Sequence, residues 1–169
     1  MAQLNIERYR NRAYRKKKTL TAFLKKLGKS KTRGILKVAA EVDKEVWKEV
    51  NCLDCANCCK KMTPTYTRKD INRISKHFKM TYQQFYDKWL HVDENKDVVN
   101  VSTPCQFLGK DHKCKIYAIR PTDCAEFPHF TRKDFRYQVR EKVFNQNVVY
   151  CPATLVFVEK LKEKIENDL

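Results

Sequence analysis

The sequence predicts an α+β fold that is mainly α, with a short β-hairpin, irregular cysteine-bearing loops and a basic helical arm in front. Apolar residues recur at three- and four-residue spacing in several segments, as on the buried face of a helix. Four of the eight cysteines lie in CLDCANCC, between Cys52 and Cys59. Residues 1–37 carry a net charge of +12, whereas residues 38–169 carry only +4. The predicted division is therefore a basic N-terminal arm, residues 1–37, and a cysteine-cluster domain, residues 38–169.

The arm is expected to be helical or partly disordered. Its apolar residues between Leu4 and Leu27 are only loosely periodic, so we expect thin apolar packing there. Gly28 and Gly34 bracket a predicted break. After it, apolar residues recur from Ile35 to Val50 and predict an amphipathic helix that runs into Cys52.

Three further helices are predicted from their start signals. Thr67 is followed three residues later by Asp70, which fits a helix cap and an acid near the positive end of the helix dipole. Thr81 and Gln84 repeat this spacing. Pro152 fits the first position of a last helix, whose apolar face ends at Ile165.

Short extended segments are predicted between these helices. Residues 98–101 are β-prone, and CQFL at 105–108 and CKIY at 114–117 flank GKDH. That turn sequence predicts a tight hairpin with Gly109 available for a positive φ. Residues 135–143 alternate like a strand.

The cellular compartment determines whether the cysteines are interpreted as disulfides or as free thiols. The first residues lack the apolar core of a secretory signal, and no run of about 18 apolar residues could span a membrane. We therefore expect a cytoplasmic protein with no membrane span. Thiols stay reduced there, which favours metal binding or catalysis over disulfides.

Cysteine spacing predicts that the domain is organised by a metal. Two-residue gaps let thiolates converge on one centre, and the remaining cysteines each lie at a turn or at the end of an element. The predicted metal ligands are Cys52, Cys55, Cys58, Cys59, Cys105, Cys114, Cys124 and Cys151. Zinc would take four sulfurs at a time. An iron–sulfur cluster would suit the Cys-x2-Cys-x2-Cys run with a remote Cys-Pro, as in bacterial ferredoxins, so zinc and an iron–sulfur cluster both remain open.

Three motifs follow one another along the chain: CLDCANCC, TRKDINRI and PCQFLGKDHKCKIYAIRPTDCAEFP. In this order they resemble the bacterial YkgJ-like CxxCxxCC family of zinc- or iron-chelating proteins. The resemblance covers about residues 52–152 and implies a cysteine-ligated metal centre built from the cysteines named above. Ala56 stands where the family usually has glycine. Some relatives resemble a flagellin lysine methylase with the same kind of cysteine cluster, which implies by analogy a protein-modifying activity.

Residues near the cysteines have alternative interpretations. Arg120 would either offset thiolate charge or form a salt bridge with Asp123 or Glu126. His112 and His129 are alternative ligands. With three glycines in the chain, a glycine-rich loop for a nucleotide is not expected.

Three functions remain open, and no catalytic residue is identified. The first is a metal-binding protein with a structural or metal-handling role. The second is an iron–sulfur-dependent enzyme that modifies a protein substrate. The third is a nucleic-acid-associated zinc module, in which Lys and Arg of residues 1–37, with Tyr9 and Tyr14 interleaved, contact phosphates without sequence specificity. The alternative for this arm is a solvated charged helix, or a helix that docks on an acidic partner.

Overall fold

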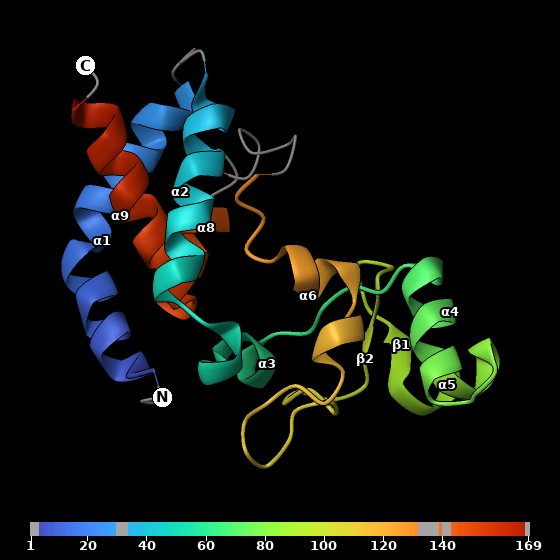
Figure 1. The fold of residues 1–169 in the computed structure, drawn as a ribbon. Helices are drawn as coiled ribbons and strands as arrows, with labels where there is room; N and C mark the ends of the chain where they lie inside the picture. Colours follow the sequence, from blue (N-terminus) through green and yellow to red (C-terminus); the bar gives the residue numbers. More distant parts are fainter. Residues whose placement is uncertain (1–3, 30–33, 132–138, 140–142, 168–169) are drawn as a thin grey trace. The chain divides into compact units, whose positions relative to one another are not determined.

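The computed structural model describes residues 4–29, 34–131, 139 and 143–167, and the chain divides into two compact units. Unit 1 comprises Met1–Cys52 and Pro128–Leu169, and unit 2 is Leu53–Phe127. Helices predominate, and one two-stranded antiparallel sheet is present in the described ranges, so the mainly α, α+β class is confirmed (Figure 1). The predicted boundary at residue 37 falls inside unit 1.

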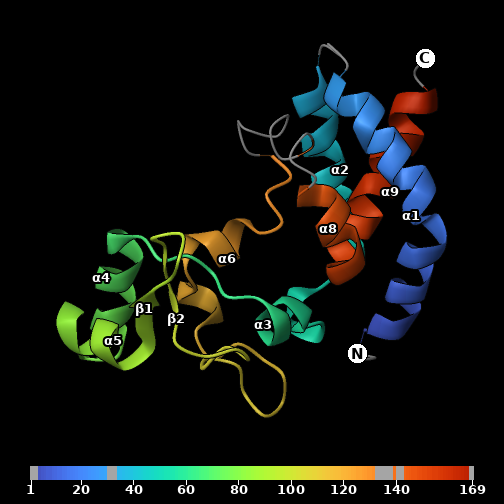
Figure 2. The ribbon, with the colours of Figure 1, turned by 180° about the vertical axis from the view of Figure 1, so that it is seen from behind.

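Unit 1 is a group of helices that pack side by side (Figures 1 and 2). They are α1 (Ile6–Lys29), α2 (Ile35–Glu49), α8 (Val143–Tyr150) and α9 (Pro152–Asn167). Helix α9 contacts the other three, and α1 also contacts α8. Pro152 begins α9 as predicted, because its missing N–H costs nothing at the first helical position.

The expectation of thin packing for α1 is wrong. Leu20, Leu24 and Leu27 are buried in the core of unit 1. The amino-terminal half of α1 also packs on this core, through Tyr9 and Ala13, and Arg12 and Lys16 add ion pairs with Glu159 of α9. The loosely periodic helix is thus held by both apolar packing and ion pairs.

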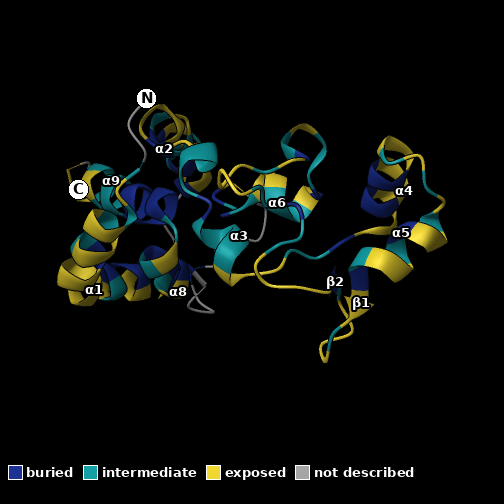
Figure 3. Cartoon of the chain, turned by 90° about the horizontal axis from the view of Figure 1, so that it is seen from below, coloured by how far each residue is buried: buried dark blue, intermediate teal, exposed yellow. Residues whose placement is uncertain are grey.

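Unit 2 has short elements around a small aromatic core. Its helices are η1 (Cys52–Asp54), whose first residue belongs to unit 1, α3 (Asn57–Lys61), α4 (Arg68–His77), α5 (Tyr82–Trp89), η2 (Tyr117–Ile119) and α6 (Thr122–Glu126). Both predicted helix starts are confirmed as capping boxes, at Thr67 with Asp70 and at Thr81 with Gln84. Figure 3 shows the buried face of α4.

The hairpin lies elsewhere than predicted. Strand β1 (Leu90–Val92) pairs antiparallel with β2 (Val98–Asn100), with Leu90 opposite Asn100. The predicted hairpin around GKDH is reduced to one bridge between Leu108 and Cys114. The positive φ falls at His112, at 63°, and not at Gly109. A Cβ at Gly109 would displace the Asp111 carboxylate.

The strand predicted for residues 135–143 lies largely outside the described residues. Val143, its last residue, begins α8. No helix in the described part of the chain is long and apolar enough to cross a membrane.

Candidate metal centre

The cysteine-rich segment between Cys52 and Cys59 folds as two short helical turns, η1 and α3, joined at Ala56. Ala56 has φ 52°, in the left-handed region that glycine adopts most easily. Within α3, the adjacent thiols of Cys58 and Cys59 lie side by side, with 4.0 Å between their Sγ atoms. The hydrogen bond with Cys58 lowers the pKa of Cys59 to about 7, although burial opposes the shift.

Three cysteines distant in sequence join this segment within unit 2. The N–H of Cys105 donates to the carbonyl oxygen of Cys59 at 2.8 Å. Cys105 and Cys114 both pack against the aromatic core of the unit, and Cys124 lies in α6. Together they form the four-thiol cluster, made of Cys59, Cys105, Cys114 and Cys124.

The members of the four-thiol cluster are close enough to interact electrostatically. Burial raises the pKa of Cys105, Cys114 and Cys124, and negative charge on Cys59 raises each of them further. Burial and the charges of the same three thiols raise the pKa of Tyr66. Without a cation, Cys105, Cys114 and Cys124 therefore favour the neutral thiol, and a bound cation would offset the repulsion among the thiolates.

Hydrogen-bond donors already surround two of these sulfurs. The backbone N–H groups of Phe107 and Ile116 stabilise the thiolates of Cys105 and Cys114, each two residues before. Such N–H groups directed at sulfur accompany Cys-based metal sites.

Asn100 supplies a further donor from β2. Its Oδ1 accepts hydrogen bonds from Tyr66 at 2.7 Å and from Gln106 at 2.9 Å. Its Nδ2 is buried without a partner that meets hydrogen-bond geometry, yet the side chain lowers the pKa of Cys105. A buried amide donor costs free energy when unpaired, and a thiolate beside it would satisfy it. The residues therefore fit a thiolate-bound metal.

A buried carboxylate positions the segment that carries Cys124. Asp70 is 1% exposed and accepts hydrogen bonds from Thr67 and from the N–H and hydroxyl of Thr122, the first residue of α6. Arg73, which pairs with Asp70 at 2.8 Å, also donates to the carbonyl oxygens of Ile119 and Arg120. Burial alone would raise the pKa of Asp70, but the bonds from Thr67 and Thr122 bring it to about 2.

Arg120 lies near the cluster without bonding directly to a sulfur. Its guanidinium stands 3.9 Å from the centre of the Tyr117 ring and donates to the Tyr117 carbonyl at 2.6 Å. Its charge nevertheless lowers the pKa of Cys114, which favours the predicted role of offsetting thiolate charge.

Of the remaining predicted ligands, Cys58 lies next to the cluster, with its Sγ atom 4.0 Å from that of Cys59. Cys55 and Cys58 belong to unit 2, whereas Cys52 and Cys151 belong to unit 1. Cys151 packs against the helical core, and burial raises its pKa against hydrogen bonds from Thr154 and Ala153 at the start of α9. His112 is exposed in the GKDH turn, and His129 belongs to unit 1.

Within the described ranges, no group of three or more Cys, His, Asp or Glu side chains is already spaced to bind one metal ion. The four thiols are thus neighbours that would have to draw together around an ion. The eight-cysteine ligand set stays a prediction. Asn100 and Tyr66 were missed from the sequence, because they meet through a bridge between Thr65 and Val99, which are distant in the chain.

Comparisons with known proteins agree with the cysteine pattern. The family model CxxCxxCC, described as "Putative zinc- or iron-chelating domain", matches residues 51–152. An uncharacterized protein of Methanocaldococcus jannaschii is 32% identical over 85 residues, which cover 47% of this chain and 44% of that protein. The match thus spans less than half the length of this curated relative. No solved structure matches the chain.

Proposed function

The chain belongs to the CxxCxxCC family, and on this basis we propose that it is a metal-binding protein whose four-thiol cluster binds zinc or an iron–sulfur cluster. The observation that carries the proposal is the convergence of thiols from separate segments of unit 2, with the Asn100 amide facing Cys105. Cys52, Cys55, Cys58 and Cys151 stay predicted ligands.

The proposed role of the metal is to tie together loops that contain little regular secondary structure. The described backbone around Cys105 and Cys114 forms turn hydrogen bonds and one isolated bridge, between Leu108 and Cys114. A bound metal supplies coordination free energy that ties such segments together, and this free energy becomes folding free energy in small metallodomains. A metal-handling role would use the same thiols. The predicted protein-modifying activity stays a prediction, as does a nucleic-acid-associated zinc module.

Metal and acid-labile sulfide analysis, with a visible absorption spectrum of protein purified without oxygen, tests the proposal. Iron and sulfide in equal amounts with visible absorption would identify a cluster, and stoichiometric zinc without colour would identify a zinc site. Neither metal after reconstitution with each would overturn the proposal.

Variants locate the site. Cys105→Ser and Cys124→Ser should each lower the bound metal to well below one ion or cluster per chain. Lys113→Ala provides the control, because Lys113 is exposed beside Cys114 in the same loop. Full metal content in both cysteine variants would contradict the assignment to this cluster.

A further inference from the structure

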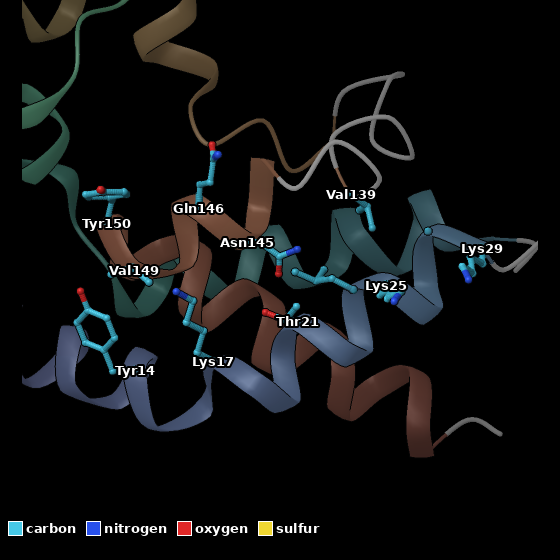
Figure 4. A pocket seen from close by; sticks show the side chains of 12 residues that line it. Tyr14, Lys17, Thr21, Lys25, Lys29, Val139, Asn145, Gln146, Val149 and Tyr150 are labelled. Carbon is cyan, nitrogen blue, oxygen red and sulfur yellow. The ribbon is translucent and has the colours of Figure 1, made fainter.

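Unit 1 contains a groove that the proposed metal centre does not use. It lies between α1 and α8 and has a volume of about 990 Å³ (Figure 4). Its lining residues are Tyr14, Lys17, Thr21, Leu24, Lys25, Gly28, Lys29, Val139, Asn145, Gln146, Val149 and Tyr150. Lysine, tyrosine and amide side chains thus surround a short apolar floor.

The lysines follow one face of α1. Tyr14, Lys17, Thr21, Lys25 and Lys29 are separated by three or four residues, which places them along one side of a helix. Lys17 and Lys29 are twelve residues apart, about 18 Å along the axis. The positive charges therefore form a row, which suits an extended anion better than a single small one.

Several described acidic residues of unit 1 form ion pairs with residues that do not line the groove. Glu159 pairs with Arg12 and Lys16. Between α2 and α9, Glu49 pairs with Lys160 at 2.7 Å and Glu45 pairs with Lys164 at 2.9 Å.

The groove itself has no counter-charge among the residues that line it. Neither Asp nor Glu is among them, and no described ion pair involves Lys17, Lys25 or Lys29. All three lysines are exposed. Their charge is thus available to a partner from outside the chain.

Two aromatic rings distinguish this groove from a simple basic patch. Tyr14 of α1 is 56% exposed and Tyr150 of α8 is 49% exposed. Figure 4 shows both at the same end of the groove, with Lys25 and Lys29 toward the other end. Exposed aromatic rings beside a lysine row are the surface on which nucleotide bases stack while phosphates follow the charges.

We propose that this groove binds single-stranded nucleic acid, with the phosphates along Lys17, Lys25 and Lys29 and bases stacked on Tyr14 and Tyr150. The proposal is independent of the metal centre. An acidic peptide would match the lysines but would not use the exposed rings, so the stacking surface favours nucleic acid. Amide side chains on α8, at Asn145 and Gln146, add hydrogen-bonding groups that suit any base.

Fluorescence anisotropy with labelled oligo(dT) and oligo(U) of about 12 nucleotides, a length within common site sizes, tests the proposal on the full-length, metal-loaded chain. We expect binding that weakens as salt increases. The K17Q/K25Q/K29Q variant should lower the slope of log affinity against log salt by about two, because each phosphate contact contributes about 0.7 for single strands.

The matched control is K69Q/K76Q/K79Q, which removes the same charge from exposed lysines of unit 2. It should retain the wild-type slope. Tyr14→Ala and Tyr150→Ala should each weaken binding at least about fivefold, the lower limit for one base stacked on an aromatic ring. Circular dichroism and metal content should be unchanged in all these variants, which separates this proposal from failure of the metal site.

Three results would overturn the proposal. They are no binding of either oligonucleotide at low salt, equal losses in the two triple variants, and polyglutamate binding as tight as oligonucleotide binding. The last result would assign the groove to an acidic protein. Tighter binding of oligo(U) or of oligo(dT) would support the proposal and identify RNA or DNA as the preferred strand.

Discussion

At the scale of single residues, Ala56 has a backbone conformation that its side chain disfavours. Its φ of 52° lies in the left-handed region, where a residue other than glycine costs about 1–3 kcal/mol. The resemblance to the family implies that glycine is usual at this position, and the structure gives the reason. The turn between Cys55 and Cys58 requires the reversed backbone.

Ala56→Val should therefore destabilise the protein by about 2 kcal/mol, because a β-branched side chain tolerates this region poorly. Ala56→Gly should remain within about 1 kcal/mol of the wild type, since lost methyl burial opposes the relief of strain. Urea unfolding of the metal-loaded protein measures both changes. Equal stability of the two variants would contradict the backbone argument.

Asn100 offers a second test at this scale. Asn100→Asp keeps the shape but replaces the amide that faces Cys105 with an acceptor. We expect metal affinity to fall by about ten- to a hundredfold, the usual cost of losing a group that supports a ligand. Competition with a chromophoric chelator measures the affinity.

The matched control is Asn95→Asp, an exposed position in the β1–β2 turn. It makes the same change of charge away from the cluster and should leave the affinity unchanged. An equal loss at both positions would assign the effect to net charge alone.

At the scale of elements, Asp70 joins two helices. It caps α4 and also binds Thr122 at the start of α6, which carries Cys124. Asp70→Asn should destabilise the protein by about 2 kcal/mol at neutral pH, because charge-assisted bonds to buried groups are lost. The exposed Asp87→Asn variant is the control, measured by urea unfolding.

The pH dependence has a defined sign. The pKa of Asp70 falls from 3.8 to about 2 on folding, so its carboxylate stabilises the fold above about pH 4. This contribution decreases as the pH falls from about 4 toward 2. The stability difference between wild type and Asp70→Asn should shrink over that window, and a constant difference would contradict this role.

Cys151 stands at the junction of α8 and α9, where its thiol accepts hydrogen bonds at the start of α9. Serine makes the same kind of contact at a helix start. We therefore expect Cys151→Ser to keep α9 folded, so the metal content of this variant tests the prediction that Cys151 is a ligand. Loss of metal from Cys151→Ser would establish Cys151 as a ligand.

At the scale of the whole molecule, the two units differ in how much apolar core they have. Among the described residues, twenty buried apolar side chains form the core of unit 1 and seven form that of unit 2. A small core alone supplies little stability, so unit 2 should depend more on a metal.

The two tryptophans report on the units separately. Trp47 of α2 lies against Phe130, with 6.2 Å between ring centres, and Trp89 packs on Phe78 at 4.9 Å. Metal removal by a chelator should shift the emission of Trp89, measured in a Trp47→Phe variant. The emission of Trp47, measured in Trp89→Phe, should change little. Simultaneous loss of both signals would mean that the units unfold together.

Local signals in the sequence determined the helices and the identity of the reactive groups. Helix caps at Thr67 and Thr81, the apolar repeat from Ile35 and the start at Pro152 all depend on neighbours within a few residues, so their prediction is confirmed. Cysteine spacing likewise indicated the family. Neither signal contains information about partners distant in the chain.

Tertiary structure alone decided which distant groups meet. The bridge between Thr65 and Val99 brings Tyr66 to Asn100, and Asp70 fixes the start of α6, which carries Cys124. Packing of α1 against α8 and α9 turned a basic arm into one wall of a groove. These contacts depend on long-range burial and hydrogen bonding, which a pattern of three- and four-residue spacings does not encode.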